Sequence, residues 1–215
     1  MKKIAVVLAG NGVFDGAEIH EATLTLYSIV KNGATYEIFA PDINQYHVID
    51  HLTGNEMKEK RNVLTESARI ARGKINDLGK FKADDFDAII FPGGFGVAKN
   101  LCTFAFDGSN CKVNFDVEKA IRSMHERKKP IGALCISPVL IAKVLDDIEV
   151  TIGQDKDTAR AINEMGAKHT DTTHGEIIVD EKNKIVTTPC YMLDANIGQI
   201  GDGANNVVKK IVEMI

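Results

Sequence analysis

The sequence predicts an α/β fold in which a mostly parallel sheet carries helices on both faces. Short apolar runs alternate with helical stretches along most of the chain, which is typical of repeated β-α units. The first apolar run, 3–9, has no polar residue after Lys3, as expected of a strand that is covered on both faces. A length of 215 residues suits one domain, so we expect a single domain over 1–215.

The expected elements follow from the apolar periodicity and the turn residues. Strands are expected at 3–9, 35–39, 88–91 and 131–134, followed by a hairpin of 176–179 and 184–187. Helices are expected at 17–31, 97–106, 116–127 and 138–145, with a last helix that begins near 194 or 204 and ends at 214. In such sheets, ligands bind at the carboxyl ends of the strands, which here are 10–18, 92–96 and 135–138.

The segment 42–80 interrupts this alternation. It has a charged middle at 55–61 and a helix-like stretch at 62–72, which ends at Gly73. The apolar stripe of that stretch needs cover. We therefore expect an insertion packed on the core as a wall of the cleft, a lid or a dimer contact.

Composition and charge exclude several classes of protein. The net charge is −4, and a nucleic-acid or anionic-membrane partner would favour a basic patch instead. The first apolar run is short and no cleavage pattern follows it, so it is not a signal peptide. The four cysteines form no CxxC pair and are most simply reduced thiols. We expect a cytoplasmic protein with neither nucleic-acid nor membrane partners.

Cys135 is the sharpest candidate for chemistry. It directly follows the strand 131–134, and Ser137 and Pro138 are suited to begin a helix. A helix N-terminus stabilises a thiolate and lowers the pKa of the thiol. Ala133 and Ser137 are also small enough for a tight nucleophile turn. A buried structural cysteine is the alternative interpretation.

Glu18 is the second candidate, with two interpretations. Asp15 and Glu18 have the spacing of a helix N-cap and its capping glutamate. Alternatively, Glu18 faces Cys135 from a neighbouring strand end.

The run 92–96, Pro-Gly-Gly-Phe-Gly, is the third candidate. The N–H of Gly94, together with that of Ile136, could form an oxyanion hole. A plain glycine turn is the alternative. The Gly10-Asn11-Gly12 run lacks the third glycine of a dinucleotide site.

The histidines identify neither a base nor a metal site. His169 and His174 precede the expected hairpin, and either could reach the cleft. His20 follows Glu18 by two residues, so on a helix it points elsewhere. No spacing matches a metal-ligand set, and no metal is expected.

Several segments together match one superfamily. They are 14–21 (Phe-Asp-Gly-Ala-Glu-Ile-His-Glu), 51–54, 68–73, 91–94 with 98–101 behind it, the Cys135 turn and 186–189. The chain resembles the DJ-1/PfpI branch of the class I glutamine-amidotransferase-like superfamily. Within that branch it is most similar to the isoprenoid-biosynthesis glyoxalase family, also called enhancing lycopene biosynthesis proteins.

This resemblance implies a flavodoxin-like three-layer sandwich and a homodimer. It implies a nucleophilic Cys135, with Glu18 hydrogen-bonded to the sulfur and the N–H groups of Gly94 and Ile136 as oxyanion donors. The implied reaction converts glyoxal or methylglyoxal to the 2-hydroxy acid through a hemithioacetal on Cys135, without glutathione, metal or other cofactor.

The residue after Cys135 departs from the superfamily pattern, and this limits the reactions that are expected. Many members place a histidine directly after the cysteine, where this chain has Ile136, so Cys-His amidotransferase or peptidase chemistry is disfavoured. Any histidine role falls to His169, His174 or His20. The alternative function is a redox-sensing or chaperone-like protein that uses oxidation of Cys135.

Overall fold

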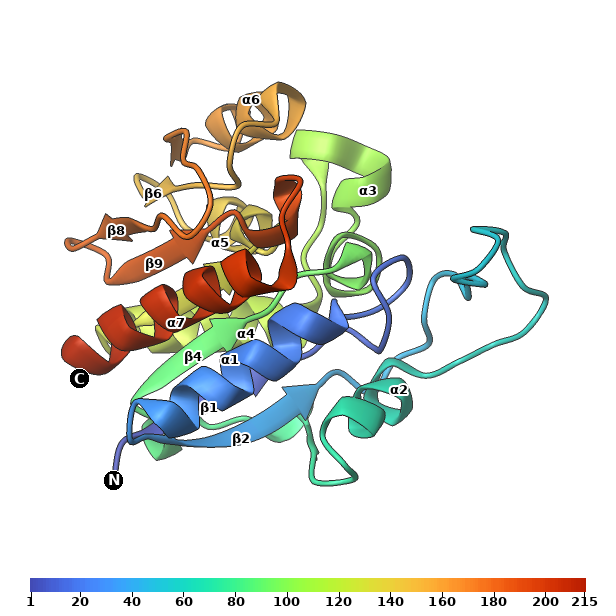
Figure 1. The fold of residues 1–215 in the computed structure, drawn as a ribbon, viewed down its shortest axis with the longest axis horizontal. Coiled ribbons are helices and arrows are strands. Elements are labelled where there is room, and N and C mark those ends of the chain that lie inside the picture. Colours follow the sequence, from blue (N-terminus) through green and yellow to red (C-terminus); the bar gives the residue numbers. More distant parts are fainter.

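The computed structural model describes all 215 residues and contains one seven-stranded sheet (Figure 1). The strand order is β3-β2-β1-β4-β5-β9-β8, and every pair is parallel except β8 with β9. The strands are β1 (Lys3–Val7), β2 (Thr35–Ala40), β3 (Asn76–Asp77), β4 (Ala88–Phe91), β5 (Ile131–Leu134), β8 (Ile178–Asp180) and β9 (Ile185–Thr188). A second, two-stranded sheet pairs β6 (Glu149–Val150) with β7 (Lys168–His169). The predicted flavodoxin-like α/β fold is confirmed.

Helices cover both faces of the large sheet. They are α1 (Ile19–Lys31), α2 (Val63–Ile70), α3 (Phe104–Asp107), α4 (Phe115–Glu126), α5 (Pro138–Val144), α6 (Lys156–Glu164) and α7 (Ile197–Glu213). Helices α1 and α7 lie side by side on one face (Figure 1) and enclose a core cluster of 21 buried residues. Helices α4 and α5 enclose a cluster of 30 on the other face. The three layers bring the carboxyl ends of β1, β4, β5 and β9 to one edge.

The prediction of one continuous helix over 97–106 is wrong, because the helix is interrupted in its middle. The chain forms a π-helical turn over Val97–Leu101 and then the short helix α3. Between them Cys102 is extended and forms an antiparallel bridge with Val113. Pairing with a distant segment therefore interrupts the helix that local periodicity favours. Helix α6 and the β6–β7 pair were not predicted.

Two expected helix caps are replaced by other contacts. Helix α1 begins after Glu18, whose carboxyl accepts the N–H of Glu21, so the N-cap is Glu18 and not Asp15. Asp15 accepts the N–H of Ile49 instead (2.7 Å). Ser137 occupies the expected N-cap position of α5, but its hydroxyl makes no capping hydrogen bond and donates instead to the carbonyl of Pro92 at the end of β4 (2.8 Å).

The segment 42–80 packs at this carboxyl edge, and its loop between β2 and α2 projects from the body (Figure 1). His51 Nε2 accepts the N–H of Phe14 (3.2 Å), and Asn100 Oδ1 accepts the N–H of Tyr46 (2.9 Å). The last part of the segment, β3, extends the sheet beside β2. The insertion is therefore held on the core at both ends. No helix of the protein combines the length and apolar character needed to cross a bilayer.

We predict that Gly132→Val destabilises the fold. A Cβ at this position of β5 would lie 2.6 Å from the Cδ1 of Ile211 on α7. Overpacking of this kind costs about 1–3 kcal/mol. The matched control is Gly201→Ala on α7, where the nearest atom lies 3.9 Å away and a helical glycine is replaced, so stability rises by roughly 0.5–1 kcal/mol. Urea unfolding measures both; equal stability of Gly132→Val and the parent would contradict the close approach.

Candidate active site

Cys135 lies at a strained turn directly after β5. Its φ is +60°, a left-handed conformation that non-glycine residues rarely adopt and that clusters at functional sites. Its N–H donates to the carbonyl of Thr188 at the end of β9 (2.9 Å). The side chain is 7% exposed. The predicted nucleophile turn is therefore present, in the middle of the sheet.

Gly93, at the end of β4, packs directly against this turn. A Cβ at Gly93 would lie 2.4 Å from the Cβ of Cys135, 2.9 Å from its sulfur and 2.6 Å from Glu21 Oε2. No larger residue fits there without displacing the thiol or the carboxyl. The glycine run at 92–96 thus has a close-packing role beyond that of a plain turn.

The carboxyl group hydrogen-bonded to the sulfur belongs to Glu21. Its Oε2 accepts the N–H of Gly93 (2.9 Å), and its Oε1 accepts the N–H of Tyr191 (3.2 Å). Complete burial, with a smaller effect of the nearby Glu18 charge, raises the pKa of Glu21 to about 8. At neutral pH this carboxyl is mostly protonated, and it can donate its proton to the sulfur.

The expected hydrogen bond from Glu18 to the sulfur is therefore wrong by one helical turn. Glu18 is the N-cap, and its Oε2 is bound to the N–H of Glu21 (2.7 Å). Its carboxyl nevertheless lines the same pocket as Cys135. Two carboxyl groups thus flank the thiol, one hydrogen-bonded to the sulfur and one at the pocket surface.

The expected lowering of the thiol pKa is also wrong. Burial, followed by the neighbouring Glu21, raises the pKa of Cys135 well above its ordinary value. The N–H groups of Gly94 and Ile136 donate toward the sulfur and lower this pKa, but by less than burial raises it. Helix α5 has only seven residues and begins three positions later, so its dipole does not offset the loss of water.

The N–H groups of Gly94 and Ile136 are free to stabilise an oxyanion. Neither donates to a backbone carbonyl, and both point toward the Cys135 sulfur. Both N–H groups are thus placed beside the thiol, and their role as oxyanion donors stays a prediction.

A mainly apolar pocket of about 320 Å³ opens over the thiol. Its walls come from the β1, β4 and β5 ends, from α3 and α6, and from the segment after β9. The lining residues are Val13, Glu18, Gly94, Phe95, Ala98, Phe104, Ala105, Cys135, Ile136, Asp155, Thr158, Tyr191 and Met192. None of them comes from 42–80, so that insertion is not a wall of this pocket. Its role as a lid or as a dimer contact stays a prediction.

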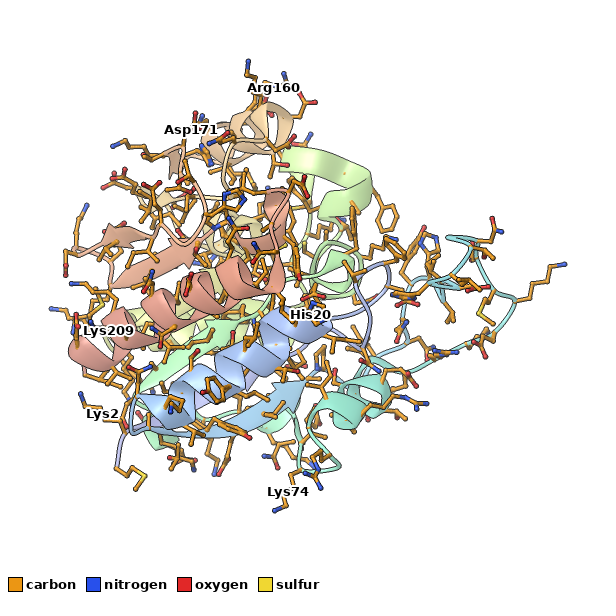
Figure 2. All side chains as sticks on the ribbon, in the orientation of Figure 1. Lys2, His20, Lys74, Arg160, Asp171 and Lys209 are labelled. Atoms are coloured by element: carbon orange, nitrogen blue, oxygen red, sulfur yellow. The ribbon has the colours of Figure 1, made fainter.

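Of the three candidate histidines, only His20 lies near these carboxyl groups. It sits at the start of α1 (Figure 2), with Nδ1 2.8 Å from the hydroxyl of Tyr191 and 4.0 Å from Glu18 Oε1. His169 is buried elsewhere, where its Nε2 accepts the N–H of Ile152 and burial lowers its pKa. His174 is bound to the carbonyl of Asp194 and does not line the pocket.

Sequence reasoning missed Glu21 and Tyr191. A signal for Glu21 was available, because it shares the buried face of α1 with Ala22, Thr25 and Leu26, and a glutamate in phase with a buried stripe needs partners. Tyr191 carries no such signal. It reaches the site only because β9 pairs with β5, which places the next turn beside Cys135.

The family model that matches residues 2–192 describes the DJ-1/PfpI family. The chain belongs to this family. It is 51% identical to the rat protein named "ES1 protein homolog, mitochondrial", over 99% of the chain and 84% of that protein. It is also 51% identical to the human "Glutamine amidotransferase-like class 1 domain-containing protein 3, mitochondrial", over 99% of the chain and 83% of that protein.

The fold closely matches a solved structure from Ehrlichia chaffeensis. That structure is described as an isoprenoid biosynthesis protein with an amidotransferase-like domain; it is 36% identical, with a TM-score of 0.93 over 100% of this chain and 99% of that one. Glyoxalase III from Candida albicans shares the fold at 14% identity, with a TM-score of 0.65 over 99% and 97% of the two chains.

The names of these relatives contradict the expected cytoplasmic location. Both mammalian relatives and the zebrafish ES1 protein are named mitochondrial. The expectation rested on the lack of a signal-peptide pattern and on cysteines that suit a reducing compartment, and neither observation separates one reducing compartment from another.

We predict that Glu21→Gln changes how stability depends on pH. The folded protein holds the Glu21 proton up to about pH 8, whereas an exposed glutamate releases it near 4.5. The folded state therefore binds more protons in this window, and the stability from this group is lost as pH rises from 4.5 through 8. Glutamine has no proton to lose, so that decline disappears.

Urea unfolding at pH 5, 7 and 9 measures the effect. At pH 5 the variant is less stable by about 1 kcal/mol, because an amide NH₂ cannot accept one of the two backbone N–H groups. At pH 9 it is more stable than the parent. A stability difference that is constant from pH 5 to pH 9 would contradict the raised pKa.

Proposed function

We propose that the protein is a cofactor-independent glyoxalase that converts glyoxal or methylglyoxal to the 2-hydroxy acid. The observation that carries the proposal is the arrangement around Cys135, whose backbone is strained and whose thiol lies below a small pocket. The N–H groups of Gly94 and Ile136 are directed at the sulfur, and the carboxyl groups of Glu21 and Glu18 lie beside it. These are the parts that addition to a carbonyl and proton transfer between adjacent carbons require. Glyoxalase III shares the fold, which is consistent with this class of chemistry.

The first step joins the sulfur of Cys135 to the aldehyde carbon. The carbonyl oxygen becomes an oxyanion that accepts the N–H groups of Gly94 and Ile136. The thiol proton is transferred by way of Glu21 to that oxygen, which gives a hemithioacetal. Since burial raises the thiol pKa, proton transfer must accompany carbon–sulfur bond formation.

The second step moves a proton between two carbons. Glu18, the carboxyl that lines the pocket, removes the C–H proton of the hemithioacetal to give an enediolate. The hemithioacetal hydroxyl passes its proton to the neighbouring oxygen, and Glu18 returns its own proton to the carbon that bears this oxygen. The product is a 2-hydroxy thioester of Cys135. Water then cleaves the thioester, releasing the 2-hydroxy acid and restoring the thiol.

Tyr191 and His20 are suited to support this carboxyl. The Tyr191 hydroxyl and Glu18 both approach Nδ1 of His20, and Tyr191 lines the pocket. We propose that these side chains position Glu18 and exchange its proton with solvent. This arrangement would take the place of a histidine next to the cysteine.

We predict lactate formation from methylglyoxal in the absence of glutathione. Cys135→Ser should lose at least 100-fold in kcat/KM, on the order of the loss when a nucleophile is removed. The matched control is Cys190→Ala, which removes another buried thiol near the same carboxyls and should keep most of the activity. If the parent forms no lactate but Cys135 alone is oxidised by peroxide, the redox-sensing alternative is the better account.

We predict that Glu18→Gln separates capping from catalysis. Glutamine can still accept the N–H of Glu21, so stability should stay within about 0.5 kcal/mol of the parent. It cannot carry a proton between carbons, so kcat should fall by about 100-fold or more. Glu18→Ala is the comparison that loses both functions. Full activity in Glu18→Gln would assign Glu18 to capping alone.

A further inference from the structure

A second pair of thiols lies outside the Cys135 site. Cys102 and Cys111 are 3% and 2% exposed, and backbone pairing holds their segments together. Cys102 bridges Val113, and Thr103 N–H donates to the carbonyl of Lys112 (3.0 Å). The ends of the 102–111 loop are therefore fixed beside each other.

The two side chains lie on the same face of this pairing, because Cys102 is opposite Val113 and Cys111 is two residues before Val113. The thiols of Cys102 and Cys111 are hydrogen-bonded, and both cysteines are free. The Cys102 sulfur also lies 3.4 Å from the carbonyl oxygen of Val97. Two free thiols on backbone segments that are paired in this way are suited to form a disulfide.

We propose that Cys102 and Cys111 form a reversible intramolecular disulfide when the protein meets a hydroperoxide. The Cys111 thiolate attacks one peroxide oxygen and breaks the O–O bond, giving a sulfenic acid and water. The Cys102 sulfur then attacks the Cys111 sulfur, and the sulfenic oxygen leaves as a second water molecule. Two thiols lose two electrons and two protons, and hydrogen peroxide becomes two waters.

The surroundings of the two thiols indicate that Cys111 attacks the peroxide and that Cys102 then attacks Cys111. The pKa of Cys111 is lowered by the Cys102 hydrogen bond and by Lys143, whose ammonium group is held at the carbonyl of Ser109 (2.8 Å). The pKa of Cys102 is raised by the same hydrogen bond and by burial. Cys111 is buried, but its neighbours Asn110 and Lys112 are exposed, so its segment runs at the surface. The thiolate is the form that peroxide oxidises, and burial raises the pKa of both Cys135 and Cys190.

The disulfide would act on the wall of the active-site pocket. The loop that it closes carries α3, and Phe104 and Ala105 of α3 line the pocket above Cys135. Closing the loop restricts the conformations of this wall. Oxidation of Cys102 and Cys111 therefore changes the pocket wall without modifying Cys135.

The test uses the full-length chain with Cys135→Ser and Cys190→Ser, so that only the two cysteines remain. On titration with hydrogen peroxide, both thiols should disappear together, the intact mass should fall by two hydrogen atoms, and dithiothreitol should reverse both changes. With Cys102→Ser added, Cys111 should stop at a sulfenic acid that dimedone traps. With Cys111→Ser added instead, Cys102 should stay reduced at the same dose.

Peptide mapping of oxidised wild-type protein provides a measurement that needs no substitution. A cross-linked peptide that joins Cys102 to Cys111 supports the proposal. Three outcomes would overturn it: both thiols persist at a dose that oxidises a surface thiol, each is oxidised separately to a sulfinic acid, or the cross-link joins two chains.

Discussion

The contact between the Glu21 carboxyl and the Cys135 sulfur organises the whole carboxyl edge of the sheet. A buried carboxyl must find hydrogen-bond partners, and Glu21 takes its partners from Gly93 after β4 and Tyr191 after β9. Together with the thiol after β5, one side chain of α1 thus ties three strand ends to the helix above them. The same crowding leaves no space for a Cβ at Gly93. The positive φ of Cys135 is held by these neighbours on every side.

This packing favours a site that is neutral before the substrate binds. A thiolate and a carboxylate side by side in a buried site would repel each other and lose hydration, and the raised pKa values of Cys135 and Glu21 express both costs. Negative charge is instead accommodated where the N–H groups of Gly94 and Ile136 converge. Charge that develops on a substrate oxygen meets donors already in place, whereas charge on the resting thiol is disfavoured. For the proposed reaction, the arrangement would therefore stabilise the transition state more than the resting site.

The strands and the nucleophile turn could be predicted from sequence because their signals are local. Uninterrupted apolar runs at 88–91 and 131–134 give β4 and β5 with the expected bounds. Glu21 was missed because Asp15 fits the pattern of an N-cap, although its carboxyl binds Ile49 of the insertion. The helix begins instead after Glu18, and Glu21 lies on its buried face. Helix α6 was missed because few of its side chains are both apolar and buried; Ile162 is the principal one.

The break in the helix expected at 97–106 shows why predictions from local sequence are wrong mainly near Cys135. A regular helix there would satisfy its own backbone, but the π-helical turn brings Asn100 under the first strand end. Its Nδ2 donates to the carbonyls of Ala9 and Asp15, and its Oδ1 accepts the N–H of Tyr46. One amide thus joins β1, the following glycine loop and the insertion. The same irregular turn places Ala98 in the pocket wall and leaves Cys102 extended opposite Val113. Backbone regularity is lost here because long-range hydrogen bonds to the loops around Cys135 replace it.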